Sequence, residues 1–387
     1  MNKYNTVLGQ MLDLISRSRF EKLVKEYKTE HGAKGLSSWT QFVTMLFSQI
    51  SGQSSLRSME KCMNNQRNGW YHMGITNTEK EIKRSTLSYA NANRDSNLYK
   101  AFFEYILAIA QSTNNKHRFK FNNPLYSIDS TTIDLCLKLF PWAKFRKGKG
   151  GIKLTVKLDH QGKIPCFITE SNACEHDINK IYEVPYSAGD VLVFDRGYTD
   201  YVYYKQLCMK KAYFVTRLKD NAVYKRIKKR VVREGGNVIS DYEIKIPSLS
   251  EEIVFRKIKV KDPERKKKIT ILTNNLQWSS ATIAAVYKDR WQIELFFKAI
   301  KQNLKIKKFY GNSKNAVMTQ IWIAMIAYLL FHIIKEKYNC IDLSFTLFIS
   351  VLKTILFQRV SLYELLCATS PPSKPKQILS CNLEFAW

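Results

Sequence analysis

Residues 191–195 read Val191-Leu192-Val193-Phe194-Asp195, a wholly apolar stretch that ends in an acid. A short apolar run rich in valine predicts a strand that is buried on both faces. Upstream of it, the residue patterns predict strands at 125–135, 151–159 and 164–170 and a short helix at 177–184. Three strands, a helix and a fourth strand in that order favour a mixed α/β fold.

Two acids belong to these strands. Asp129 lies within the first strand, and Asp195 ends the fourth. If the two strands are neighbours, their carboxylates approach each other. Asp134, five residues after Asp129, projects from the opposite face of the sheet because side chains alternate along a strand. His176 and Asp177, after the third strand, either approach the acids or form a structural hydrogen-bonded pair.

A third acid, Glu294, lies in a predicted helix at 280–310 with the spacing Tyr287-x2-Arg290-x3-Glu294-x6-Lys301. At about 100° per residue, these four side chains fall within about 60° of one another. Arg and Lys bind phosphate groups, and a Tyr hydroxyl can donate a further hydrogen bond. This helix face is therefore suited to phosphodiester chemistry, whereas Asp289 projects from the opposite side.

The alternative for this segment is a solvated helix on which Glu294 pairs with Arg290 and Lys298. The surrounding side chains are too apolar for a surface helix, which argues against that alternative: Trp291, Ile293, Leu295, Phe296, Phe297 and Ile300.

The three acids predict a metal site. Carboxylates cannot share a small site in their ionised form unless a cation neutralises them. Their oxygens suit Mg²⁺ or Mn²⁺, and two such ions about 3.5 to 4 Å apart stabilise the attacking and leaving oxygens of a displacement at phosphorus. We therefore predict that Asp129, Asp195 and Glu294 are metal ligands, with two ions bound.

The charge of the chain favours a polyanionic partner. The 387 residues include 62 Lys and Arg against 33 Asp and Glu, a formal charge of +29, and nucleic acid is the partner that such an excess favours. An anionic lipid surface is the alternative. However, the longest apolar run, 321–334, has 14 residues, fewer than the roughly 18 needed to cross a bilayer. We expect it to be a buried core helix, with no membrane partner.

The protein is expected to stay in the cytoplasm. Its first residues lack the basic, apolar and small-residue order of a signal peptide. The eight cysteines show no Cys-x-x-Cys pair and no regular spacing with the six histidines. We therefore expect reduced cysteines and neither zinc nor disulfides.

The length allows two or three domains, and the predicted layout has three. Residues 1–118 are helical, 119–338 form the α/β domain, and 339–387 form a helical C-terminal region. Basic strands at about 219–274 interrupt the α/β domain as a β insertion.

Basic side chains outside the acid motifs suggest where a nucleic acid binds. A predicted helix at 82–94, which includes Arg84, fits a helix that enters a DNA groove; a capped surface helix from Ser85 fits equally well. Basic stretches such as the one containing Lys147 and Lys149 are individually typical of solvated loops. Their number, together with the net charge, favours a DNA channel.

The segments around the acids resemble the DDE transposases of bacterial insertion sequences, in particular the insertion-sequence-four type. The match comprises residues 127–132 around the first acid, residues 193–198 around the second, and the complete signature of Tyr287, Arg290, Glu294 and Lys301. The resemblance covers roughly residues 120–335. It implies a ribonuclease-H-like catalytic core interrupted by a β insertion. The residue pattern before this core adds an all-helical N-terminal domain, which we expect to bind DNA ends.

The resemblance also implies an activity, cut-and-paste DNA transposition. Water would attack a phosphodiester at the end of the element, and the released 3′ hydroxyl would then attack target DNA, with Mg²⁺ or Mn²⁺ bound. The partners implied are double-stranded DNA, both terminal inverted repeats and target, and a second copy of the chain in a homodimer at the bacterial nucleoid. By resemblance, Tyr287, Arg290 and Lys301 would hold DNA phosphates near the cut. The basic side chains of the sequence add further predicted DNA contacts at Arg196, Lys147, Lys149 and Arg84.

Two other classes share parts of this pattern. A ribonuclease-H-like nuclease that cuts without joining would carry the same acids, and a non-catalytic DNA-binding repressor would keep the charge without needing the acids. An aspartyl-phosphate phosphatase would need an acid two residues after Asp195, where Gly197 stands. The residues leave open whether cleavage passes through a DNA hairpin.

Overall fold

The computed structural model describes residues 5–33, 35–76, 81–111, 117–146, 149–232, 236–247, 249, 253–261, 268–340 and 343–367. The chain forms two compact units. The first, here the helical unit, comprises Met1–Thr113 and Ala299–Trp387, and the second, here the sheet unit, comprises Asn114–Lys298. The predicted layout of three domains assigns a function to each domain, and these two units are defined by packing alone. The three-domain layout therefore stays a prediction.

The sheet unit is mixed α/β. Its strands are β1 (Leu125–Leu135), β2 (Lys144–Arg146), β3 (Lys149–Asp159), β4 (Ile164–Asn172), β5 (Val191–Phe194), β6 (Tyr213–Arg217), β7 (Lys225–Lys229), β8 (Val238–Lys245), β9 (Phe255–Lys261) and β10 (Lys268–Thr273). Its helices are η2 (Pro141–Ala143), α7 (Asp177–Ile181), η3 (Arg196–Tyr198), α8 (Tyr201–Met209) and α9 (Ser280–Asp289), followed by α10 (Trp291–Asn303), which continues into the helical unit.

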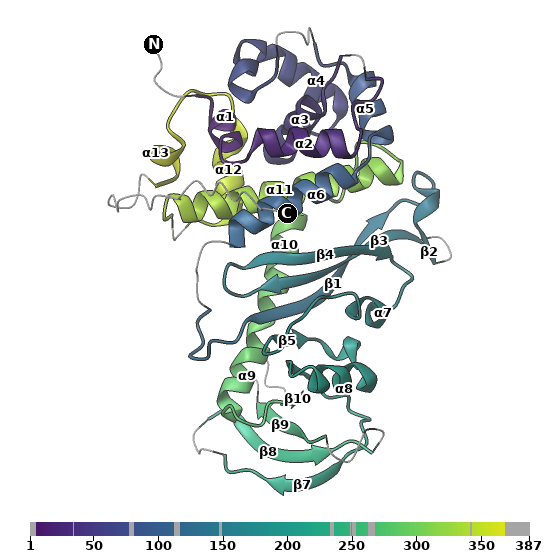
Figure 1. Ribbon diagram of the computed structural model, residues 1–387, viewed down its shortest axis with the longest axis vertical. Coiled ribbons are helices and arrows are strands. Elements are labelled where there is room, and N and C mark those ends of the chain that lie inside the picture. The colour runs from purple at the N-terminus through teal and green to yellow at the C-terminus, as the bar shows by residue number, and fades with distance from the viewer. Residues whose placement is uncertain are drawn as a thin grey trace. The chain divides into compact units, whose positions relative to one another are not determined.

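All ten strands belong to one sheet. The order is β2-β3-β1-β5-β6-β10-β9-β8-β7, and β4 also pairs with β3. The strand β1 runs antiparallel to β3 and parallel to β5, and β5 runs parallel to β6. The prediction that the strands carrying the first two acids could be neighbours is therefore confirmed. The insertion strands β7 to β10 extend this same sheet beyond β6 (Figure 1).

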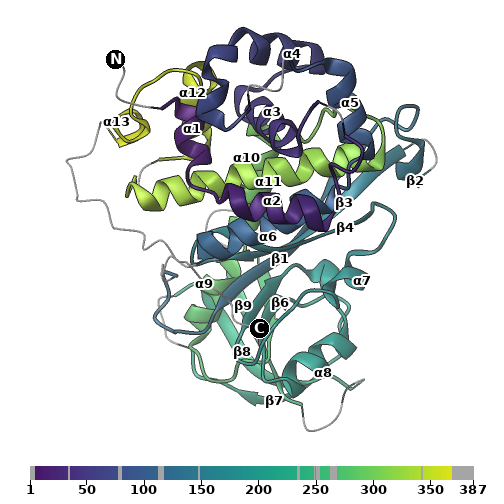
Figure 2. The same ribbon diagram turned by 45° about the horizontal axis from the view of Figure 1, so that its top comes forward.

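Helices cover both faces of the sheet because alternate side chains along its central strands are apolar on each face. On one face, Leu192 and Phe214 pack in a cluster with Tyr204 of α8. On the other face, Val193 packs in a cluster with Ile283 of α9. Figures 1 and 2 show α8 and α9 on opposite sides of the strands. Strands buried on both faces explain the wholly apolar run at 191–194.

The helical unit contains α1 (Val7–Leu12), α2 (Arg17–Glu26), α3 (Ser38–Ser51), α4 (Leu56–Asn65), η1 (Arg67–Met73), α5 (Arg84–Asn93), α6 (Asn97–Gln111), α11 (Lys314–Lys337), α12 (Phe345–Ile355) and α13 (Leu362–Cys367). By length and hydropathy, α11 could cross a membrane, but 94% of its apolar window is buried. It packs against α3, α5, α6 and α12. The prediction of a buried core helix is confirmed.

Two predictions about helices need correction. The helix expected at 280–310 is interrupted, because α9 ends at Asp289 and α10 begins at Trp291. At the junction, the Arg290 N–H donates to the Tyr287 carbonyl and the Ile293 N–H donates to the Arg290 carbonyl, each at 3.2 Å and with three-residue spacing. Arg290 itself keeps right-handed helical backbone angles, so the break between Tyr287 and Glu294 is one residue long. The second correction is that α5 begins at Arg84 without a side-chain cap, instead of a capped start near Ser85.

A third correction concerns sulfur chemistry. Cys62, Cys136, Cys166, Cys174 and Cys208 are free thiols. Cys340 is disulfide-bonded, so the expectation that every cysteine is reduced is wrong at this position.

Candidate active site

The register of β1 and β5 brings the first two acids to the same place. In this parallel pair, Ser127 lies opposite Val193 and Ile128 lies opposite Phe194. Continuing the register by one residue sets Asp129 beside Asp195, on strands about 4.8 Å apart. By alternation, Ser127 and Asp129 share the face of Leu125, which packs in the cluster with α9. Both acids therefore face the helix that leads to Glu294.

Arg290 joins the first acid to the third. Its Nη1 lies 3.3 Å from Asp129 Oδ2, and its Nη2 lies 2.5 Å from Glu294 Oε1. The side chains of Arg290, Asp129 and Glu294 are 16%, 22% and 33% exposed. The pairing of Glu294 with Arg290 that a solvated helix would give is present. It is part-buried, however, and reaches an acid 161 residues away in the chain.

The acids act on one another electrostatically. Burial raises the pKa of Asp129 from 3.8 to about 6. The backbone N–H of Ser130 and the charge of Arg290 oppose this rise, while the negative charges of Asp195 and Glu294 add to it. In the metal-free state, Asp129 is thus a carboxylate short of positive charge.

This raised pKa predicts a pH-dependent gain from Asp129→Asn in EDTA. Below about pH 4, Asp129 is protonated in both states and costs nothing. Between pH 4 and 6 only the unfolded chain releases its proton, so wild-type stability falls as pH rises. We expect the variant to be more stable than wild type by about 2–3 kcal/mol at pH 7 and nearly equal to it near pH 4, measured by urea unfolding.

The matched control is Asp134→Asn, which removes an exposed acid from the same strand. It should give no gain that grows between pH 4 and 7. A gain for Asp129→Asn that is equally large at both pH values would show that burial of its charge is not the cause.

Three residues near Asp129 were not singled out by the sequence analysis: Ser130, Lys153 and Tyr198. Ser130 Oγ donates to Asp177 Oδ1 at 2.5 Å, and Lys153 Nζ lies 2.9 Å from the same oxygen. Asp177 thus approaches the acids through Ser130 and is not paired with His176. Tyr198 is buried, and burial is the main cause of its raised pKa. The charges of Asp129, Asp177 and Asp195 add to the rise, and a hydrogen bond with Ser130 opposes it. The hydroxyl residue directly after Asp129 was the available sequence signal.

The predicted phosphate-binding residues are in different settings. Tyr287 is partly buried; burial raises its pKa to about 12, and Arg290 and Asp195 also act on it. Lys301 follows Glu294 by seven residues on α10, about two turns. Arg196 begins η3 next to Asp195 and forms an exposed ion pair with Asp220 at 3.3 Å.

The other three are away from this cluster or outside the described residues. Arg84 is exposed at the start of α5 in the helical unit, where its backbone N–H donates to Glu60. Lys147 and the side chain of Lys149 lie outside the described part of the chain.

The residues suit a divalent cation by chemistry. Three part-buried carboxylates are hard oxygen ligands, and the charges of Asp195 and Glu294 add to the effect of burial in raising the pKa of Asp129. Within the described residues, no group of three or more His, Cys, Asp and Glu is already arranged around one ion position. The Arg290 guanidinium instead lies between two of the acids.

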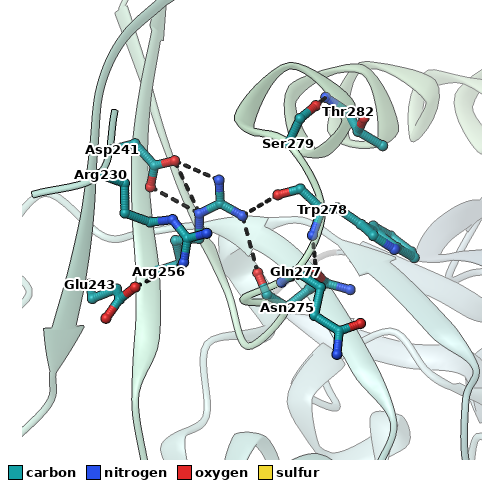
Figure 3. A network of polar contacts seen from close by, with 9 residues as sticks. All are labelled: Arg230, Asp241, Glu243, Arg256, Asn275, Gln277, Trp278, Ser279 and Thr282. Carbon is teal, nitrogen blue, oxygen red and sulfur yellow. Dashed lines mark hydrogen bonds and ion pairs between the residues drawn. The ribbon is translucent and has the colours of Figure 1, made fainter. Parts of the chain in front are cut away.

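A pocket of about 1300 Å³ opens beside this cluster within the sheet unit. Residues on and around β8 to β10 and α9 line it, and its cationic side chains are Arg118, Arg230, Arg256, Lys261, Lys288 and Arg290. Trp278 also lines it and stacks on Phe121, with ring centroids 3.9 Å apart. Figure 3 shows how the buried Arg256 bonds to Asp241 and to the turn from Asn275 to Trp278.

The mixed α/β sheet brings carboxylates together where the parallel pairing of β1 with β5 ends, beside a cationic pocket, and this arrangement suits metal-dependent chemistry on phosphodiesters. The family described as "Transposase DDE domain" matches residues 121–330. The chain belongs to this family. A domain of unknown function, DUF4372, matches residues 3–76.

Relatives named as transposases agree with this membership. A protein named as transposase y4zB in Sinorhizobium fredii is 35% identical over 282 residues, 70% of this chain and 77% of its own. One named for insertion sequence element IS5377 in Geobacillus stearothermophilus is 29% identical, over 60% of this chain and 63% of its own. One named for IS4SA in Synechocystis is 28% identical, over 72% and 76%.

The cryo-EM structure of a piggyBac transposase synaptic complex with hairpin DNA is similar over 96% of this chain and 84% of its own. Its sequence identity is 11% and its TM-score is 0.46. The family and the relatives show that this chain is a DDE transposase, an enzyme that cuts DNA and transfers strands with the help of a divalent metal.

Proposed function

We propose that Asp129, Asp195 and Glu294 hold the divalent ions of this transposase, Mg²⁺ or Mn²⁺. The observation that carries this proposal is that Arg290 forms ion pairs with both Asp129 and Glu294. The register of β1 and β5 sets Asp195 beside Asp129. When bound, the ions would activate the attacking oxygen and stabilise the leaving oxygen at phosphorus. The acids hold and orient them.

Arg290 has a second part in this proposal. A guanidinium that neutralises two acids in the metal-free protein becomes available when cations replace it, and it then suits a bidentate contact to a DNA phosphate. Tyr287, which acts electrostatically on Arg290, would donate its hydroxyl to the same phosphate region. Lys301, two turns along α10, would bind a phosphate further along the DNA.

The detailed type is also part of the proposal. We infer a ribonuclease-H-like core of the insertion-sequence-four type. Three antiparallel strands in the order β4-β3-β1 followed by parallel β5 and β6, with a four-stranded insertion, support it. The intact spacing from Tyr287 to Lys301 supports it as well.

The DNA is proposed to run along the cationic pocket of the sheet unit. Its cations and the net charge of +29 favour phosphate contacts that weaken with salt. Arg84 and Arg196 are further proposed contacts, and the helical unit is proposed to read the terminal repeats through α5. A homodimer that bridges two ends, acting in the bacterial cytoplasm, completes the proposal. The lysine-rich β7 has a simpler role too, because charged edge strands resist pairing with other chains.

The experiment combines purified protein with Mg²⁺, a labelled duplex that carries the inverted repeats flanking its gene, and a supercoiled plasmid. We expect cleavage at the repeat boundary and joining to plasmid, both lost in Asp195→Ala. Cutting without joining would favour a nuclease. Binding without cutting would favour a repressor, and activity that survives in Asp195→Ala would remove Asp195 from the site.

A further inference from the structure

A buried chain of hydrogen bonds crosses the sheet unit next to the acids. His160 Nε2 lies 2.7 Å from Ser127 Oγ, and His160 Nδ1 lies 2.8 Å from Asp289 Oδ2. Ser127 is 0% exposed, His160 5% and Asp289 8%. The other oxygen of Asp289 pairs with Arg118 Nη2 at 2.8 Å.

These three residues come from segments that carry the acids. Ser127 precedes Asp129 by two residues on β1, so both side chains lie on one face of the strand. Asp289 is the last residue of α9 and immediately precedes Arg290. The backbone N–H of His160 also donates to the Leu125 carbonyl at 3.0 Å, so His160 is attached to β1 at two points.

The electrostatics of Asp289 agree with a fixed, charged link. Burial acts to raise the pKa of Asp289, but the hydrogen bond from His160 and the charges around it outweigh burial and lower it. A charged carboxylate accepts from His160 Nδ1–H, and that bond sets which ring nitrogen faces Ser127.

Two simpler interpretations are weaker. Serine, histidine and aspartate in this order are the residues of nucleophilic hydrolases, but a fully buried Ser127 cannot meet a substrate. A histidine that only stabilises the core could make bonds of the same kind between any two segments. The bonds of His160 join the strand of Asp129 to the junction that leads to Arg290 and Glu294.

We propose that His160 is a positioning residue for transposition, because it links β1 to the α9–α10 junction and thereby fixes Asp129 relative to Arg290 and Glu294. The inference rests on the function proposed above. Its physical reason is that small displacements of catalytic groups cost large factors in rate. The position of Glu294 depends on the junction because Glu294 lies in the first turn of α10, directly after it.

The test compares His160→Ala, which loses both side-chain bonds, with His160→Asn, whose shorter amide can still donate to Asp289. We expect the alanine variant to cleave end DNA about 10- to 100-fold more slowly at saturating DNA and the asparagine variant to recover several-fold. The Kd for end DNA, by fluorescence anisotropy, should change by less than about twofold. Mn²⁺ affinity, by electron paramagnetic resonance without DNA, should fall in parallel with the rate.

Asn274→Ala is the control. The Asn274 side chain also connects two segments of the sheet unit, because it accepts from the Phe214 N–H at 2.9 Å and donates to the Ala212 carbonyl at 2.8 Å. These contacts lie at the start of the parallel strands, away from the acids at their ends. We expect a loss of stability without a loss of cleavage rate or Mn²⁺ affinity.

The results distinguish a positioning role of His160 from a purely structural one. If His160→Ala, compared at equal folded fraction, loses no more rate and Mn²⁺ affinity than Asn274→Ala, the positioning role is wrong. If His160→Ala does not fold, Ser127→Ala removes one hydroxyl from the chain and should still lower both. If wild type itself does not cleave, the proposed function fails, while the Mn²⁺ affinities still decide whether His160 positions the acids.

Discussion

Replacing Glu294 with glutamine is expected to lower the rate of end cleavage by at least about 10³-fold, or about 4 kcal/mol of activation free energy. Glutamine keeps the length of the side chain, and its carbonyl oxygen can still accept from Arg290 Nη2. The fold of the α9–α10 junction should therefore survive. The lost quantity is the negative charge that a divalent ion requires, so the Kd for end DNA should stay within about twofold of wild type.

The measurement is a single-turnover cleavage assay at saturating end DNA, with anisotropy for the Kd. Glu183→Gln is the matched control, because Glu183 forms its contacts with Lys180 and Thr169 on an exposed surface of the same unit. It should cleave at the wild-type rate. Cleavage by Glu294→Gln within about tenfold of wild type would remove Glu294 from the metal site.

Much of the acid cluster could be predicted because its signals are local. Asp129 and Asp195 each lie in or after an apolar strand whose pattern is visible in a few residues, and parallel pairing then brings them together. Glu294 lies in a helical pattern with cations at helical spacing. These are short-range regularities, and the structure has strands and helices where they predict them.

The interruption at Arg290 had no local signal. Residues 287–294 contain neither Gly nor Pro, so helix propensity is continuous there. Two long-range contacts accompany the break: Asp289 bonds to His160, 129 residues away, and Arg290 bonds to Asp129, 161 residues away. Partners at such separations belong to no periodic pattern, which is also why His160 and Ser127 were missed.

The sequence also did not predict how far the sheet extends. Alternating charge in β7 to β10 predicts strands with one wet face, but it does not say which strand they join. The pairing of β10 with β6 that continues the sheet is another long-range contact. The burial of polar groups in this extension, such as Arg256, follows from that pairing and could not be predicted without it.

Arg256→Met is expected to destabilise the protein by about 3–5 kcal/mol, because it leaves the buried Asp241 carboxylate without its partner. Arg256 Nε and Nη2 bond to the two oxygens of Asp241 at 2.9 and 2.5 Å, and the two side chains are 3% and 1% exposed. The same guanidinium donates to the Trp278 carbonyl at 2.5 Å. The loss therefore also frees the turn that leads into α9. Urea unfolding measures the change.

Two variants separate the cause. Arg230→Met removes the neighbouring pair with Glu243, whose side chains are 28% and 21% exposed (Figure 3), so it should cost about 1 kcal/mol or less. The double variant Arg256→Met with Asp241→Leu removes both buried charges and should recover most of the lost stability. If the double variant is as unstable as the single one, the bonds of Arg256 to the Asn275–Trp278 turn matter more than the buried charge. The cleavage rate should then fall as well, because that turn sets the start of the helix that leads to Arg290 and Glu294.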